Sequence, residues 1–155
     1  MSTLNIHAPL SGKLIPITEV DDPVFAEKMV GDGMAIEPSD TIVRSPIEGK
    51  VTMVFDALHA IGIETAEGIE LMIHVGLETV KLKGKGFKVH TKVGKKVKVG
   101  SKLLTLDLEY LKTNAKSIIT PVVITNPDRV QHFDFSESPT INSKDIMYTI
   151  TLNNQ

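Results

Sequence analysis

The chain has 155 residues, of which 41% are hydrophobic and 23% charged, as is usual for a globular protein that folds as one domain over residues 1–155. It has no cysteine, which excludes disulfides, thiolate metal ligands and a cysteine nucleophile. The net charge of -2 predicts no polybasic surface for nucleic acid or anionic membranes, and no apolar run is long enough for membrane insertion. The start of the sequence does not resemble a signal peptide, so we expect a cytoplasmic protein.

Two stretches of the sequence echo each other. In residues 8–17 and 45–54 a proline, a glycine and a lysine fall in register, and each stretch continues as a run of β-forming residues. A weaker echo relates residues 97–106 to residues 141–150. A duplicated unit of this kind favours an antiparallel β-sandwich made of two similar halves.

The remaining elements follow in chain order. Residues 22–28 predict one helical turn capped by Asp22, residues 31–33 a tight turn, and residues 34–36 a strand. Further strands are expected at 51–55, 61–65 and 118–125, turns at 66–68 and 84–86, and a helix at 107–115 capped by Asp107. Pro121 cannot donate a hydrogen bond, which indicates an edge strand or a bend, and residues 131–138 show no clear pattern. The architecture is predicted to be mostly β with one or two short helices.

The most informative stretch is residues 69–80, an apolar run with a histidine in its middle. Alternation along a strand places Ile69, Leu71, Ile73 and Val75 on one face, and His74 on the other. Gly76 follows closely and has no side chain to keep another molecule away. On this stretch alone, a core histidine bonded to a carbonyl is an equally good interpretation.

A second histidine strengthens the functional interpretation. His59 lies fifteen residues before His74, and the turn at 66–68 would pair the two strands antiparallel and bring both rings together. Two imidazoles with no evident carboxylate triad leave three options open. They could contribute to a metal site, perform acid–base chemistry, or act as a phosphoryl acceptor and its hydrogen-bonding helper.

Taken together, these motifs resemble the glucose-class enzyme IIA domain of the bacterial phosphoenolpyruvate-dependent sugar phosphotransferase system. The resemblance runs from about Ala8 to Asn126 and is carried by residues 22–33, 59–63, 71–87, 114–117 and 120–126. It implies an all-β fold, an antiparallel β-sandwich or barrel-sandwich hybrid built from a duplicated motif.

The resemblance also implies roles for individual residues. His74 matches the histidine that accepts a phosphoryl group from the histidine-containing phosphocarrier protein and passes it to the IIB domain of a sugar permease. His59 matches the hydrogen-bond donor to that group, and Gly76 the residue whose carbonyl orients the acceptor ring. Acidic and apolar positions of the partner-binding face match Asp32, Glu78, Val30, Met34 and Val75. No cofactor is required, although a zinc ion at His59 and His74 in a protein interface is one option.

Two positions depart from the family pattern. Ala57 stands where the family usually has a threonine whose hydroxyl orients the ring of His59, so this ring is expected to be held less firmly. Glu78 stands where aspartate is common, which keeps the charge on a longer arm.

Two other classes of function compete with the phosphocarrier. A regulatory module could dock on other proteins through the same histidine face, although docking alone would not need two unprotonated imidazoles. A biotinyl- or lipoyl-type carrier would need a lysine beside methionine at a hairpin tip, and Lys28 followed by Met29 is the nearest approach.

Overall fold

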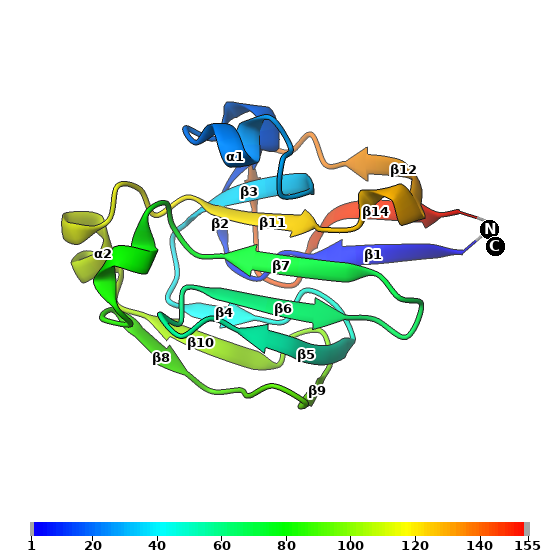
Figure 1. Cartoon of the computed structure of the whole chain (residues 1–155). Helices are drawn as coiled ribbons and strands as arrows, with labels where there is room; N and C mark the ends of the chain where they lie inside the picture. The colour runs from blue at the N-terminus through cyan, green and yellow to red at the C-terminus, as the bar shows by residue number, and fades with distance from the viewer. Residues whose placement is uncertain (1, 154–155) are drawn as a thin grey trace.

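The computed structural model describes residues 2–153, which form one eight-stranded and two three-stranded antiparallel sheets (Figure 1). The large sheet has the order β13-β2-β3-β11-β7-β6-β5-β9, and the small sheets have the orders β1-β14-β12 and β4-β10-β8. The strands are β1 (Thr3–His7), β2 (Gly12–Pro16), β3 (Asp32–Pro38), β4 (Ile42–Arg44), β5 (Gly49–Val54), β6 (Ala60–Glu64), β7 (Glu70–His74), β8 (Phe87–Val89), β9 (Lys96–Val97), β10 (Lys102–Leu106), β11 (Thr120–Ile124), β12 (Val130–Phe135), β13 (Thr140–Ile141) and β14 (Ile146–Leu152). The helices are η1 (Ile17–Glu19), α1 (Pro23–Ala26), η2 (Thr79–Leu82), α2 (Leu108–Asn114) and η3 (Pro127–Arg129).

The strand order confirms the duplication predicted from the sequence. One half of the large sheet reads β13-β2-β3-β11 from its edge to its centre, and the other half reads β9-β5-β6-β7. Gly12 of β2 pairs with Ile141 of β13, and Gly49 of β5 pairs with Val97 of β9 in the same way. Each small sheet belongs to one half, so the two echoes in the sequence are two copies of one β unit.

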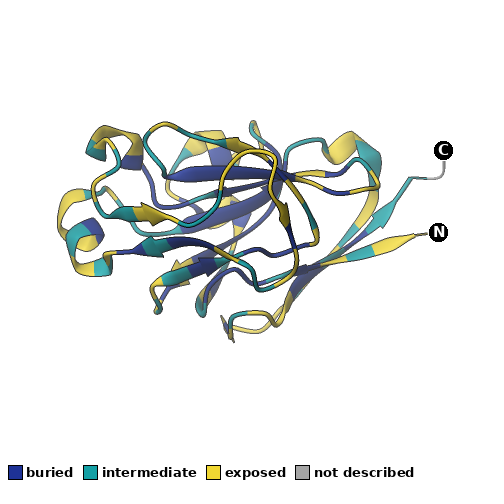
Figure 2. Cartoon of the chain, turned by 90° about the horizontal axis from the view of Figure 1, so that it is seen from below, coloured by how far each residue is buried: buried dark blue, intermediate teal, exposed yellow. Residues whose placement is uncertain are grey.

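The alternation predicted along β7 is also confirmed. Leu71 and Ile73 face the main hydrophobic core between the sheets, whereas Met72 points to the other face of the large sheet. There it joins a smaller cluster formed with Phe25 and Val123 under η1 and α1. Figure 2 shows the buried strands inside the molecule and the exposed residues concentrated at turns. The histidine of β7 therefore lies on the face that α1 covers.

Both predicted helix caps are present. The carboxylate of Asp22 accepts the N–H of Val24 (3.0 Å), and that of Asp107 accepts the N–H of Tyr110 (3.1 Å). Within residues 2–153, no helix is both long and apolar enough to cross a lipid bilayer.

The predicted turn at residues 31–33 is wrong. The chain turns at residues 27–30, and β3 already begins at Asp32. A Cβ atom added at Gly33 would lie 2.2 Å from the carbonyl oxygen of Val122. This glycine therefore marks a close approach of two strands and not a turn.

The interpretation of Pro121 as an edge or bend is also wrong. The strand β11 lies in the middle of the large sheet, between β3 and β7. Its pairing with β7 begins only at Val122, which faces Ile73. The nitrogen of Pro121 points toward β7, on the same side as the N–H that Thr125 donates to Glu70 (2.8 Å). Proline is tolerated here because its missing donor falls where the ladder with β7 has ended.

Candidate functional site

The hairpin of β6 and β7 brings the two predicted histidines together. Glu64 pairs with Glu70 and Ala60 with His74, and the N–H of Val75 is bonded to the carbonyl oxygen of His59 (2.7 Å). The ring centroids of His59 and His74 are 4.9 Å apart, with an angle of 81° between the ring planes. The antiparallel pairing predicted from the sequence is therefore confirmed, and the two imidazoles are in contact.

Two aromatic rings that sequence reasoning did not assign to the site enclose the pair. Phe25 of α1 lies 5.1 Å from His74 between ring centroids, and Phe55 lies 5.2 Å from His59 at 90°. Only 2% of the surface of His59 is exposed, whereas His74 is half-buried and reachable. Phe25 belongs to the motif at 22–33, but its contact with His74 depends on tertiary packing that the motif does not reveal.

Gly76 orients the ring of His74. Its carbonyl oxygen lies 2.9 Å from Nδ1 of His74, and because a carbonyl can only accept, Nδ1 carries the proton. In the neutral ring, Nε2 is then left with a free lone pair. The backbone of Gly76 has φ +76°, in the region that favours glycine. The turn is held by the Thr79 hydroxyl, which donates to the Val75 carbonyl (2.6 Å), and by the N–H of Leu77 on the Ser117 carbonyl (2.9 Å).

Burial keeps both imidazoles neutral near pH 7. It lowers the pKa of His59 to about 4, with a further contribution from the neighbouring charge of His74. Burial also lowers the pKa of His74, while the Gly76 carbonyl and the carboxylate of Asp22 oppose that shift. A neutral ring with an unprotonated Nε2 is a nucleophile, so the site is suited to attack on an electrophilic centre.

The orientation of His59 is less firmly determined. Within residues 2–153, its buried Nδ1 has no hydrogen-bond partner. Ala57 has no side-chain hydroxyl to offer, as expected from the departure noted in the sequence. Leu58, the residue between them, has φ +65°, which is strained for a side chain that is not glycine. Strain beside a buried, unpaired imidazole is characteristic of a functional site.

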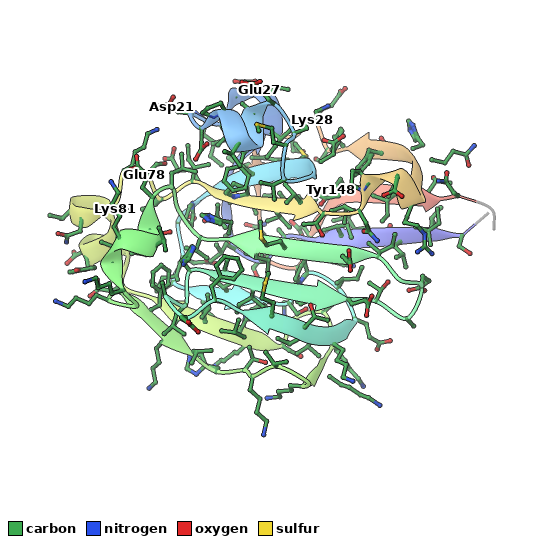
Figure 3. The ribbon with its side chains drawn as sticks, viewed as in Figure 1. Asp21, Glu27, Lys28, Glu78, Lys81 and Tyr148 are labelled. Carbon is green, nitrogen blue, oxygen red and sulfur yellow. The ribbon has the colours of Figure 1, made fainter. Side chains whose placement is uncertain are left out.

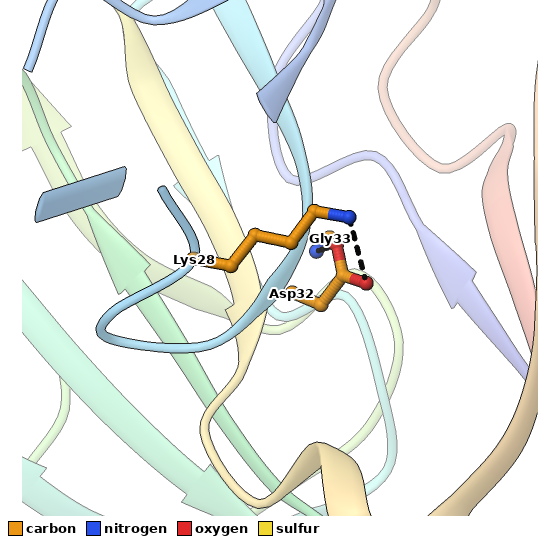
Figure 4. A network of polar contacts seen from close by, with 3 residues as sticks. All are labelled: Lys28, Asp32 and Gly33. Atoms are coloured by element: carbon orange, nitrogen blue, oxygen red, sulfur yellow. Dashed lines mark hydrogen bonds and ion pairs between the residues drawn. The ribbon is translucent and has the colours of Figure 1, made fainter. Parts of the chain in front are cut away.

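The predicted acidic residues lie in different places. Glu78 is exposed two residues beyond Gly76 and forms an ion pair with Lys81, and this lysine lowers the pKa of Glu78 (Figure 3). Asp32 does not lie against the histidines: in the sheet register it is level with Leu71, three residues or about 10 Å along the strand from His74. Asp32 is bonded instead to the N–H of Gly33 (2.8 Å) and to Lys28 (3.6 Å), as Figure 4 shows.

The predicted apolar docking residues need a similar correction. Met34 and Val75 are buried in the core, so neither offers a surface to a partner, and Val30 is half-buried. Met34 packs into the core from β3, and Val75 packs into the core just after β7. The exposed apolar side chains beside the site are Val24 on α1 and Val80 on η2.

The structure argues against two alternatives raised by the sequence, a metal site made by this chain alone and a biotinyl- or lipoyl-type carrier. Over the described residues, no group of three or more histidine, aspartate or glutamate side chains is arranged to hold a metal ion. His59 and His74 supply two nitrogen ligands where zinc takes four, so a partner protein would have to supply the rest. Lys28 lies two residues after the end of α1 and pairs with Asp32, whereas a carrier lysine would lie at a hairpin tip.

Comparisons with known proteins agree with this geometry. Residues 4–130 match the family described as phosphoenolpyruvate-dependent sugar phosphotransferase system, EIIA 1. The fold is similar to the solved structure of glucose permease IIA from Mycoplasma capricolum, with a TM-score of 0.91 and 34% sequence identity. That alignment covers 96% of each chain.

Proposed function

The chain belongs to the EIIA 1 family of the phosphoenolpyruvate-dependent sugar phosphotransferase system, and from that premise we propose that His74 is its phosphoryl acceptor. The donor in this proposal is the histidine-containing phosphocarrier protein, and the recipient is the IIB domain of a sugar permease. The observation that carries the proposal is the bond from Nδ1 of His74 to the Gly76 carbonyl, which leaves Nε2 as the free nucleophile beside His59.

The chemistry follows from these two rings. Nε2 of His74 attacks phosphorus, the new N–P bond forms, and the bond from phosphorus to the donor's imidazole breaks, so that its electron pair leaves with the donor ring. Positive charge grows on the His74 ring, and the Gly76 carbonyl stabilises it through Nδ1–H. His59, neutral near pH 7, donates its ring N–H to the phosphoryl oxygens. Onward transfer reverses these steps toward the IIB domain.

Partner docking is assigned to the surface around the half-buried edge of His74. Val24 and Val80 are exposed on either side of the site and provide apolar contact, while Glu78 adds an exposed carboxylate for a basic partner. The reaction as proposed needs no cofactor. A zinc ion would be held by His59 and His74 only together with ligands from a docked protein.

Intact-mass measurement tests the assignment. After incubation with phosphoenolpyruvate and the two general phosphotransferase proteins, the chain should gain the mass of one phosphoryl group. His74→Ala should gain none, while the control His132→Ala, which changes an exposed histidine on β12, should behave as the wild type. A phosphoryl group on the His74→Ala protein would refute the proposal.

A regulatory docking module remains the second candidate. It is favoured by the exposed apolar side chains beside the site, which serve any docked protein equally well. Docking that persists unchanged in His74→Ala, together with no phosphoryl uptake by the wild type, would support that function in place of the phosphocarrier.

A further inference from the structure

Lysine is strongly concentrated in one part of the chain. Residues 79–106 contain nine of the chain's 17 lysines and arginines and none of its 19 aspartates and glutamates. All nine lysines are exposed, and within residues 2–153 Lys81 is the only one of them in an ion pair. The prediction that the protein lacks a polybasic surface is therefore wrong, because a net charge of -2 hides the separation of the two signs.

These lysines form a face, which we call the basic edge: lysines 81, 83, 85, 88, 92, 95, 96, 98 and 102 on η2, β8, β9, β10 and the turns between them. Arg44 of β4 pairs with Lys102 and extends it. In Figure 1, β8 and β9 lie at the opposite end of the molecule from α1, and in Figure 3 the labelled Asp21 and Glu27 lie beside α1. Glutamates 48, 64 and 67 line a groove together with Lys96 and Lys98, so this face carries an excess of positive charge with acids at one border.

The basic edge also carries exposed apolar side chains at the tips of two turns. Val93 is 59% exposed and Val99 38% exposed, and each stands in a Lys-Val-Gly sequence at a turn next to β9. Nothing lies within 4 Å of the Cβ position of Gly94, so the first tip projects into open space. Lysines around a projecting valine suit a surface that is anionic outside and apolar just beneath.

We propose that the basic edge binds anionic lipid headgroups at a membrane surface, with Val93 and Val99 entering the interfacial layer. Each lysine close to such a surface strengthens binding about fivefold, so the nine together make peripheral binding strong enough to measure. Nucleic acid fits less well. Phe87, the one Phe, Tyr or Trp of residues 79–106, packs against the core and is not free to stack on bases. Residues 79–106 contain no arginine for bidentate contacts, and Arg44, which extends the face, already donates to the Gly100 carbonyl (3.1 Å).

Most of this surface lies away from the histidine site, and only its η2 end, at Lys81, borders the docking residues Glu78 and Val80. In the large sheet, β9 is separated from β7 by β5 and β6, which places it about 14 Å from the strand of His74. Phe25 of α1 covers the histidine from the other end of the molecule. The β8, β9 and β10 part of the basic edge can therefore rest on a bilayer while a partner protein docks at His74, and lipid binding does not depend on the phosphocarrier function.

Vesicle co-sedimentation tests the proposal with the full chain. Vesicles of phosphatidylcholine with phosphatidylglycerol should bind the protein at about 0.1 M salt and release it at about 0.5 M, whereas pure phosphatidylcholine vesicles should not bind it. The double variant Lys92→Gln and Lys95→Gln should bind about thirtyfold more weakly. The matched control is Lys13→Gln with Lys112→Gln, which removes the same charge from exposed sites on β2 and α2 and should bind nearly as the wild type.

A second pair of variants separates lipid binding from general attraction to anions. Val93→Ser should weaken vesicle binding severalfold, while Val24→Ser on α1 should not. His74→Ala should bind vesicles as the wild type does. No binding to the anionic vesicles, equal weakening by both lysine pairs, or stronger binding to a single-stranded RNA homopolymer than to the vesicles would each overturn the proposal.

Discussion

The substitution Gly76→Ala tests how the backbone after β7 orients the ring of His74. With φ at +76°, any residue other than glycine costs about 1–2 kcal/mol at this position. The new Cβ would also lie 2.6 Å from Cγ2 of Thr79 and 2.8 Å from the carbonyl oxygen of Ser117. Both distances are too short to keep, so the turn has to move.

The neighbours of Gly76 cannot yield cheaply. Thr79 is buried, and its hydroxyl is bonded to the carbonyl of Val75 (2.6 Å), while the Ser117 carbonyl accepts the N–H of Leu77 (2.9 Å). Overpacking of this kind typically costs about 1–3 kcal/mol. Adding the backbone cost, we expect Gly76→Ala to lower the free energy of unfolding by about 2–5 kcal/mol.

The matched control is Gly94→Ala. Gly94 has a similar backbone, with φ +93°, but nothing lies within 4 Å of its Cβ position. This variant should show the backbone cost alone, about 1–2 kcal/mol, and normal phosphoryl uptake. The difference between the two variants measures the contacts around Gly76.

Urea unfolding measures the stabilities, and ring nitrogen NMR shifts report the tautomer of His74. Displacing the Gly76 carbonyl weakens the bond that holds the proton on Nδ1, so Gly76→Ala should populate both tautomers and accept the phosphoryl group more slowly. Equal unfolding free energies for the two variants, or a single unchanged tautomer in Gly76→Ala, would refute this account of the turn.

Three further predictions concern the ring of His59. His59→Gln should still allow phosphoryl uptake at His74 but slow onward transfer, because loss of an electrostatic donor of this type costs about 2.7–4 kcal/mol. Onward transfer at the wild-type rate in quench-flow measurements would contradict this role of His59. The same variant should be less sensitive to acid, because the pKa of His59 is about 4 in the folded protein and about 6.5 in the unfolded chain. The wild type therefore loses about 3 kcal/mol of stability between pH 7 and pH 4, and the variant keeps it. Urea unfolding at both pH values measures this difference. Ala57→Thr supplies a hydroxyl to the unpaired Nδ1 of His59. It should speed onward transfer by at most about tenfold, with a stability gain of about 1 kcal/mol or less. An unchanged rate, together with a single His59 tautomer already present in the wild type, would show that another group orients the ring.

Features determined by local chemistry could be predicted from the sequence. The caps at Asp22 and Asp107 depend on residues within one helical turn, and the meeting of His59 with His74 depends on one hairpin and its register. The duplication was visible because equivalent turns need a glycine at equivalent positions. In each case the structure-forming interactions are close in sequence or repeated in it.

Features determined by long-range packing could not be predicted. The family resemblance assigns Asp32 and Met34 to the partner-binding face, and no local pattern along β3 shows that Asp32 pairs with Lys28 or that Met34 is buried. The contact of Phe25 with His74 joins α1 to β7 across many residues. The lysine cluster is a different case: it lies in one stretch of the sequence, residues 79–106, and is missed only when charge is summed over the whole chain.

Pro121 shows how an exception to a local rule shapes the site. The register of β11 with β7 places this proline opposite His74, whose backbone carbonyl faces β11. A residue with an N–H at this position would donate to that carbonyl and extend the ladder by one pair. Proline cannot, so the chain after His74 is free to leave the sheet at Val75 and turn at Gly76. The Gly76 carbonyl is then available to the imidazole of His74 and not to a strand, so the end of the ladder allows this ring to be held.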